Sequence, residues 1–457
     1  MRAAVGKICW MFLTLSAASG APGGSTPPAA TAGEPPASVA SEASPASPVL
    51  HHAPEYAISG NPGSSNITTG TGELQSFLLD RLGIHDNHGV QIGGLWLGDF
   101  NQLISGGAQP GMTSWNSLFV LDAHVDLEKL TGWWKGGSIG AQFLQLNAEE
   151  TNQEAGSVQG YSGIPGLAPL TRSELYQLWF RQSLFNEKLI IRIGKSIPTY
   201  DFGNVLRPLQ LPERQLFVPG LSGLIYTPVF INPTMLGVMP GYYNSAYGLT
   251  VTIAPVHWWY FNYGLYDGNL ARGVQTGLTG PDFNNYILQA WETGFSWRIG
   301  PHGLPGKFGT GMWYQTGTLT GGNGATQNGT SGYYAFATQR LWYLDPAKSN
   351  AGVSIFSQFG VNDSSTLPVN QYFGAGLTAF GLVPMRPRDS FGGGISWSFL
   401  NSNDFNRSSE LMFQGYYQAN IWKTVYMQPT LTYIPTPGAD SSLGGAWAVS
   451  VRATVLF

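Results

Sequence analysis

The strongest constraint in this sequence is an alternation of apolar and polar side chains, every second residue, that recurs from about Gly89 to the last residue. Successive side chains of a β-strand point to opposite faces, so this spacing predicts strands with one apolar and one polar face. The segment 117–127 shows the pattern well. Its apolar positions are Phe119, Leu121, Ala123, Val125 and Leu127, and the polar residues between them are Asp122, His124 and Asp126.

Segments of this kind number about sixteen, an even number within the range of single-chain outer-membrane barrels. Two less regular ones lie near Gly94 and Gly140. The others are "SLFVLDAHVDL", "ELYQLWFRQ", "KLIIRIG", "YGLTVTIA", "WYFNYGLY", "AWETGFSWRI", "KFGTGMWYQ", "YYAFATQRL", "GVSIFSQFG", "QYFGAGLTA", "SFGGGISWSFL", "ELMFQGYYQ", "TVYMQPTLTY" and "AWAVSVRATVLF". We therefore predict an all-β fold: a transmembrane antiparallel β-barrel of about sixteen strands, preceded by a short N-terminal helix.

The composition agrees with strands that face lipid on one side and water on the other. Asp, Glu, Lys and Arg make up only 11% of the residues, against roughly 25% in soluble globular proteins. Aromatic residues reach 13%. After the N-terminus, no run approaches the 18 or so apolar residues of a membrane-spanning helix.

The connections between the segments alternate in length, which a sandwich or a propeller gives no reason to expect. The long ones lie near 101–116, 148–172, 196–245, 268–287 and 317–330, and short ones such as "LFNE" and "PVHW" separate them. Outer-membrane barrels have short periplasmic turns and longer outer loops. This alternation places both termini of the barrel in the periplasm and predicts that the last strand closes against the first. The aromatic last residue, Phe457, resembles the signal used by the outer-membrane assembly machinery.

The N-terminal part predicts three further segments. Residues 1–20 have two basic residues, an apolar core and then small residues, the layout of a secretory signal peptide. Residues 21–70 are rich in Pro, Ala and Ser, which predicts a disordered tether. Residues 71–88 include Leu74, Phe77, Leu78 and Leu82 at helical spacing, which predicts a short amphipathic helix leading into the barrel at 89–457. The single cysteine, Cys9, lies in the signal segment, so the mature chain has no thiolate or disulfide chemistry.

A barrel of about sixteen strands leaves an aqueous lumen, which favours transport. Within 174–182, Tyr176, Leu178 and Phe180 are predicted to face outward, and Gln177, Trp179 and Arg181 inward. Parity predicts a lumen lining that includes Asp122, His124, Asp126, Arg340 and Arg452, and inward positions for Arg192, Glu292 and Arg298. These charges could be a solvated lining alone or could contact the solute. Their mixed signs argue against a strong ion selector.

The connection 196–245 is the longest between strands and is rich in Pro, Leu and aromatic residues. Loops of this length usually function or are disordered. We expect it to fold into the barrel and narrow it. Its charged residues Asp201, Arg207, Glu213 and Arg214 are then candidates for the constriction, and Trp179 beside polar residues suits the stacking of a sugar ring.

The stretch "LYQLWFRQSLFNEKLIIRIGKSIPTYDFGN" resembles the "W…Q.F…KL.LR.GK….DF" stretch of the carbohydrate-selective outer-membrane porins, the OprB-like family. Further likeness lies in "NPTMLGVMPGYYNSAYGLTVTIAP", "YGLYDGN", "FGTGMWYQTG", "GLTAFGLVPMRPRDSFGGGISWS" and "QPTLTYIPTPGA", in order, from about Leu74 to Phe457. The resemblance implies a sixteen-stranded barrel that passes glucose and similar sugars down their gradient. It also implies that Arg192, Lys195 and Asp201, in the matched stretch, hold sugar hydroxyls at the constriction.

Other readings stay open at this point: a general non-selective porin, an outer-membrane enzyme, or an adhesin. No nucleophile–base motif marks an enzyme. The strand pattern D-x-H-x-D at Asp122, His124 and Asp126 lacks further ligands for a metal, so we expect no metal and no cofactor. The net charge of −4 argues against nucleic acid. The expected partners are small neutral sugars, outer-membrane lipid and lipopolysaccharide, and the barrel assembly machinery. Whether chains act alone or as homo-oligomers is left open.

Overall fold

The computed structural model describes residues 89–166, 169–203, 205, 223–241, 243–256, 258–345, 351–422 and 424–457. The predicted signal peptide, tether and amphipathic helix, all within 1–88, lie outside these residues. The strands are β1 (Val90–Ser105), β2 (Thr113–Asp126), β3 (Gly137–Asn147), β4 (Thr171–Leu184), β5 (Leu189–Ser196), β6 (Ala246–Val256), β7 (Trp259–Asp267), β8 (Ile287–Ile299), β9 (Leu304–Thr320), β10 (Thr326–Tyr343), β11 (Gly352–Asn362), β12 (Val369–Phe380), β13 (Ser390–Leu400), β14 (Ser409–Trp422), β15 (Val425–Ile434) and β16 (Ala446–Leu456). The helical segments are α3 (Leu127–Thr131), α4 (Thr151–Glu154), α5 (Pro198–Asp201), η1 (Thr227–Val229), η2 (Pro233–Met235) and η3 (Asn269–Arg272).

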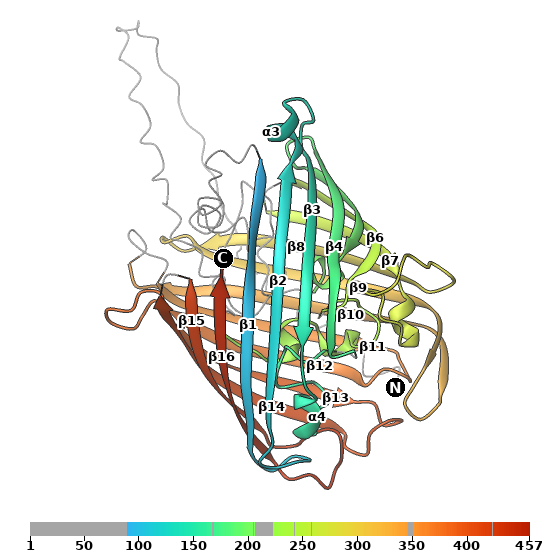
Figure 1. The fold of residues 1–457 in the computed structure, drawn as a ribbon, viewed down its shortest axis with the longest axis vertical. Coiled ribbons are helices and arrows are strands. Elements are labelled where there is room, and N and C mark those ends of the chain that lie inside the picture. Colours follow the sequence, from blue (N-terminus) through green and yellow to red (C-terminus); the bar gives the residue numbers. More distant parts are fainter. Residues whose placement is uncertain are drawn as a thin grey trace, which may run out of the picture. The chain divides into compact units, whose positions relative to one another are not determined.

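The sixteen strands form one closed antiparallel barrel in which each strand pairs with its neighbours in the chain and β16 pairs with β1 (Figure 1). This confirms the predicted architecture and strand number. The last residue takes part in the closure: the backbone N–H and C=O of Phe457 both bond to Gly94, at 3.1 and 2.8 Å. Among the described residues, none of the helices has the length and apolar character needed to cross a membrane.

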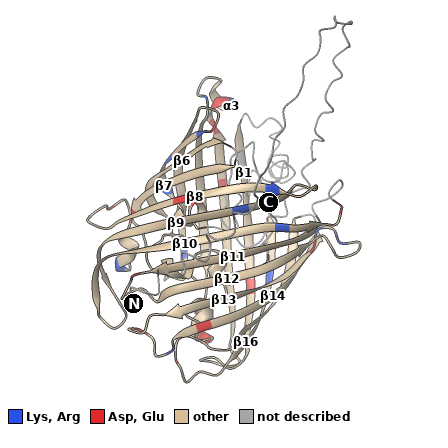
Figure 2. Cartoon of the chain, turned by 180° about the vertical axis from the view of Figure 1, so that it is seen from behind, with Lys and Arg blue, Asp and Glu red and all other residues tan. Residues whose placement is uncertain are grey.

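The two-residue alternation sorts side chains between the faces of the wall as predicted. On β2, Trp115 and Leu121 are 46% and 39% exposed on the outer face, whereas Asn116 and Leu118 on the inner face are fully buried. Figure 2 shows how few strand positions carry an acidic or basic residue. An apolar outer face beside a polar inner one is the arrangement of a barrel in a lipid bilayer.

One parity prediction was wrong. Tyr176 was expected to face outward with Leu178, but it is buried inside the barrel, at 1% exposure. The cause is a register shift between β3 and β4, where Gln142 pairs with Gln177 but the next residue, Phe143, pairs with Leu175. Such a bulge adds one residue to a strand, which reverses the facing of the residues before it.

The connections follow the predicted alternation from β3 to β9 but not before β3, because the connection predicted to be long near 101–116 is only 106–112 and is shorter than the next one, 127–136. Long connections at 148–170, 197–245 and 268–286 alternate with short turns at 185–188, 257–258 and 300–303. The long connection expected at 317–330 is mostly strand, because β9 continues to Thr320 and pairs there with Thr326 of β10. Threonine suits strands as well as loops, so the composition of this segment did not distinguish the two. We call the end that carries 148–170 the loop end and the opposite end the turn end.

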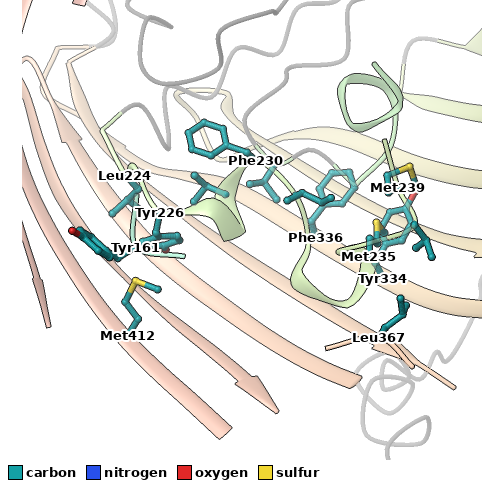
Figure 3. Packing of buried hydrophobic residues seen from close by; sticks show 14 of the residues in the cluster. Tyr161, Leu224, Tyr226, Phe230, Met235, Met239, Tyr334, Phe336, Leu367 and Met412 are labelled. Carbon is teal, nitrogen blue, oxygen red and sulfur yellow. The ribbon is translucent and has the colours of Figure 1, made fainter. Parts of the chain in front are cut away.

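The interior of the barrel is packed by the described parts of the connection 197–245. Residues such as Tyr226, Phe230 and Met235 form a buried cluster with Tyr334, Phe336 and Met412 of the wall, and Figure 3 shows these side chains gathered between the connection and the strands. Hydrogen bonds fix the connection in place. Gln414 accepts from the Ile225 amide at 2.6 Å, and Asn232 donates to the Phe359 carbonyl at 3.0 Å. The connection therefore folds inward, as predicted.

Candidate functional site

The centre of the candidate site is an ion pair between the wall and the inward connection. Arg192 points inward from the middle of β5. The chain leaves β5, enters α5 with Pro198 at its first position, and brings the carboxylate of Asp201 back onto Arg192. Thr250 Oγ1 donates to the same carboxylate at 3.3 Å, and Asn262 Nδ2 donates to the Asp201 carbonyl at 3.2 Å. The turn of chain after β5 is thus what completes the site.

An aromatic ring lies beside this pair. Trp179, on the neighbouring strand β4, has its ring centroid 5.8 Å from the guanidinium carbon of Arg192 and 6.0 Å from the ring of His124. The indole packs over Gly140 of β3, where a Cβ would collide with it. Arg181, directly opposite Arg192 in the β4–β5 register, pairs with Glu187 at 3.3 Å. The structure therefore brings together Trp179, Arg181, Arg192 and Asp201.

Exposure separates the three charged residues of this group from the other interior charges, whereas Trp179 is itself buried, at 7% exposure. The side chains of Arg192 and Asp201 each remain 11% exposed, and that of Arg181 remains 26% exposed. In contrast, Arg452 is 1% exposed and lies in a two-bond ion pair with Asp99 at 2.6 and 2.7 Å. Arg340 is fully buried, with a 3.1 Å bond to Ser354 Oγ. Of these charged residues, Arg181, Arg192 and Asp201 are the ones that can meet a solute without rearrangement.

Lys195 lies in a separate, buried cluster near the loop end. Its ammonium lies 3.9 Å from Glu174, which also pairs with Arg172 at 3.1 Å. Lys195 further donates to the backbone carbonyls of Leu175 and Gly277. This cluster joins β4 and β5 to the connection 268–286, and only 6% of the lysine side chain is exposed.

Glu292 also holds the inward connection. Its carboxylate accepts hydrogen bonds from Tyr260 at 2.6 Å, Tyr334 at 2.9 Å and the backbone amide of Gly203 at 2.6 Å. Gly203 lies two residues beyond Asp201, the end of α5, so Glu292 fixes the segment that carries Asp201. The side chain is 3% exposed, which suits a structural anchor better than contact with a passing solute.

The remaining predicted residues are spread along the barrel. Arg298 is exposed at the turn end, where it donates to the Gly303 carbonyl at 3.3 Å. Asp126 is at the same end and caps α3 by accepting from the amides of Glu128 and Lys129. Asp122 and His124 are on the inner face of β2. Arg207, Glu213 and Arg214 lie outside the described residues. No group of three or more possible metal ligands occurs within the part of the chain that the structure describes.

Sequence reasoning missed a second inward connection, 148–170. Its residues Ser157, Val158 and Gln159 all donate to the buried carboxylate of Glu410 at the start of β14, at 2.7 to 3.2 Å. Tyr161 of the same connection is 1% exposed within the interior cluster. The signal in the sequence was its length and its two prolines, Pro165 and Pro169, because Tyr161 is its one aromatic residue. Asp99 was missed as well, although parity places it on the face of Asn101.

Comparison with known proteins finds porins that resemble the chain in sequence and in fold. The family described as "Carbohydrate-selective porin, OprB family" matches residues 117–457. Porin B of Pseudomonas aeruginosa is 21% identical over 411 residues, which cover 79% of this chain and 86% of that protein. Two solved structures of Pseudomonas putida OprB share the fold. The high-pH structure has a TM-score of 0.69 at 20% identity and covers 88% of this chain and 99% of its own. The low-pH structure has a TM-score of 0.51 at 16% identity and covers 84% and 98%.

Proposed function

Because the chain belongs to the carbohydrate-selective porins of the OprB family, we propose that Arg192, Asp201 and Trp179 form the surface that selects glucose-type sugars in its channel. The protein is an outer-membrane porin for carbohydrates and not an enzyme. The observation that carries the proposal is the partly exposed Arg192–Asp201 pair beside the indole of Trp179.

The chemistry of this surface suits a neutral sugar. A guanidinium donates hydrogen bonds to sugar hydroxyls, and a carboxylate accepts them. The two charges cancel, so the surface offers strong hydrogen bonds without a net charge that would favour ions. An aromatic face can cover the apolar C–H face of the ring. Arg181 is our candidate for a second donor at the same level.

Liposome swelling with the purified protein tests the proposal. Glucose should swell the liposomes faster than a charged solute of similar size or a disaccharide. Arg192→Ala should lower the glucose rate about tenfold, because a hydrogen bond to a charged group contributes about 1.5–3 kcal/mol. Arg298→Ala is the matched control, since Arg298 is exposed at the turn end, and it should swell as the wild type does.

Two other results would lead elsewhere. Wild-type rates that depend only on solute size would indicate a general porin, the second function that the sequence leaves open. An unchanged glucose preference in Arg192→Ala would remove this residue from the selecting surface. No swelling by folded protein would contradict transport altogether.

We also propose roles for the parts that the geometry does not reach. Residues 1–20 direct export, residues 21–70 tether the barrel, and residues 71–88 form an amphipathic helix. Arg207 and Arg214 complete the constriction from the inward connection. Lys195 fixes the end of β5, where this connection begins. Phe457 is read by the assembly machinery. The mass of the mature protein tests the first point, since cleavage is expected between Ala18 and Ala21.

A further inference from the structure

The outer wall of the barrel carries a hollow of about 960 Å³ over strands β12 to β16. Its rim is formed by large outward side chains, Leu377, Phe413, Leu431 and Trp447, which are 40–48% exposed. The inward neighbours of these residues, among them Gln414 and Thr430, are buried. The hollow therefore opens to the lipid side and not to the channel.

The floor of the hollow is made by two glycines. Gly393 of β13 and Gly415 of β14 are directly opposite each other, and Leu377 and Leu431 are their outer partners in the same row across the sheet. Neighbouring strands are about 4.8 Å apart, so the missing side chains leave a notch about 10 Å wide between the two leucines. A notch of this width fits a hydrocarbon chain.

The backbone angles do not require glycine at either position, although a Cβ on Gly393 would lie 3.2 Å from the Gln414 carbonyl oxygen. Neither residue has a positive φ, and the β13–β14 register is regular across them. A Cβ on Gly415 would meet nothing nearer than the Gly392 carbonyl oxygen, at 3.8 Å. Glycine inside a strand costs stability relative to a residue with a side chain. Where no bulge or bend explains it, glycine in a strand often marks the close approach of a ligand or of another backbone.

At the turn end, the hollow is bordered by a second group of residues, which is polar and cationic and is called the cationic rim. Tyr417 borders the hollow, and its hydroxyl donates to Asp389, which also pairs with Arg386. Arg386 is 42% exposed at its side chain and donates to the Asn420 carbonyl at 3.0 Å. Arg388, two residues further along the chain, is half-exposed. Counted over Arg386, Arg388 and Asp389, these groups carry one net positive charge.

The spacing between rim and notch matches a lipid. Gly393 is three residues beyond Ser390, the first residue of β13, and three residues of strand span about 10 Å. Exposed Ile421 and Trp422 lie at the same end, at 58% and 63% exposure, as expected at the level of the headgroups. A phosphate at the arginines would place the upper part of its acyl chain in the notch.

We propose that this hollow binds one glycerophospholipid of the periplasmic leaflet, with its phosphate at Arg386 and Arg388 and one acyl chain over Gly393 and Gly415. A flexible acyl chain can enter a notch that is two strands wide. The convex wall of a second barrel cannot reach the floor between the protruding leucines. The cationic rim complements a phosphate, and a second apolar wall would leave it unmatched.

Native mass spectrometry of the full chain, titrated with phosphatidylglycerol in mild detergent, tests the site. The wild type should retain one lipid per chain. Gly415→Leu fills the notch from a position with open space outward, and it should reduce lipid retention at least tenfold. Ala453→Leu is the matched control, because it adds the same side chain on the outer face of β16 away from the hollow. It should retain lipid as the wild type does.

Further variants separate the parts of the site. Arg386→Gln with Arg388→Gln should weaken retention of phosphatidylglycerol and leave that of an uncharged diacylglycerol unchanged. If Gly415→Leu does not fold, as judged by heat-dependent electrophoretic mobility, Gly415→Val replaces it with the same expectation, since valine favours strands.

Equal lipid retention by the wild type and the filled notch would overturn the proposal. So would a two-chain species that the filled notch dissociates, which would assign the hollow to a second copy. Liposome swelling of Gly415→Leu should stay at the wild-type rate, so the outcome is independent of the sugar site.

Discussion

Gly140 shows how a residue without a side chain shapes the candidate site. It lies on the inner face of β3 beneath the indole of Trp179, which in turn lies beside Arg192. The ring can rest against the wall only because no Cβ is present there. The position of the aromatic surface is thus set by a residue that never touches a solute.

Gly140→Ala should push the indole off the wall and toward Arg192. We expect a loss of about 1 kcal/mol, the scale of an aromatic contact, and therefore a glucose swelling rate about fivefold below that of the wild type. Gly415→Ala, on the outer face, is the control and should not change the rate. Equal rates for both variants would show that the ring position does not matter for transport.

Asp389 predicts a dependence of stability on pH. Burial alone would raise the pKa of its carboxyl, but hydrogen bonds from Arg386, Tyr417 and the Asn420 amide outweigh this and hold the pKa below its ordinary value. A lowered pKa stabilises the folded protein above the pKa of the unfolded chain, about 3.9. This contribution is lost as the pH falls through the lower, folded value.

Asp389→Asn should therefore be less stable than the wild type at pH 7, by about 1–3 kcal/mol for the lost acceptor. It should also lose less stability on acidification below about pH 4. The unfolding midpoint in guanidinium chloride, measured from pH 7 to pH 2, checks both points. Asp282→Asn, at an ion pair with 50% of the carboxylate side chain exposed, should change the profile little. A parallel shift in both variants would contradict the assignment.

At this scale, the sequence predicted which side chains face inward but not which can be reached. Parity places Arg192, Glu292, Arg340 and Arg452 on the inner face, and the structure has all four there. Their exposure depends on partners from distant parts of the chain, such as Asp99 for Arg452 and Gly203 for Glu292. No local pattern contains these contacts.

Among the elements, both inward connections are held at several points along the wall. The connection 197–245 is bonded from Glu292 to Gln414. In 148–170, Gln159 bonds to Ser396 and Ser398, and Gln414 donates to the Tyr161 carbonyl. Glu410 gathers the most bonds of this second connection, because it accepts from Ser157, Val158 and Gln159, and also from the Gly438 amide at 2.6 Å. Its substitution therefore tests the second connection.

Glu410→Ala should release the connection 148–170 from β14 and widen the passage. Each amide left without an acceptor in a buried place costs about 1–3 kcal/mol, so the inward position should lose its advantage. We expect a disaccharide to enter liposomes faster than with the wild type. Glu410→Gln keeps one acceptor oxygen and should fall between the two. Unchanged disaccharide rates would show that this connection does not limit passage.

The existence of the strands was the most predictable feature of the fold, and the residues at which they begin and end were the least predictable. All sixteen predicted segments are strands, because one lipid-facing row per strand imposes strict alternation. The bulge at Tyr176 escaped, since one extra residue leaves the composition unchanged. The strand ends at Thr320 and Thr326 were not predicted, because threonine suits strands as well as loops.

For the whole molecule, the closure between β1 and β16 decides whether a barrel exists. The ring of Phe457 stacks on Phe119 with centroids 5.6 Å apart, next to its two backbone bonds with Gly94. Phe457→Ala should lower the yield of assembled barrel in cells several-fold, measured as the heat-modifiable fraction in outer membranes. Val455→Ala, two residues earlier on the same face, is the control.

Refolding in detergent separates two causes of that loss. A variant that refolds normally without cellular factors would indicate that the assembly machinery reads Phe457. A variant that fails in both settings would indicate that the ring stabilises the closure itself. Full assembly in cells would contradict both.

The buried pair of Asp99 and Arg452 favours one register between the two strands that close the barrel. The two residues are 353 positions apart and directly opposite in the register of β1 and β16. A slip of one residue would turn the arginine toward lipid, where it costs about 2–4 kcal/mol near the midplane. A slip of two would keep the facing but leave two buried charges without their partners. Only the native register pairs both charges, so a barrel closed in any other register is less stable.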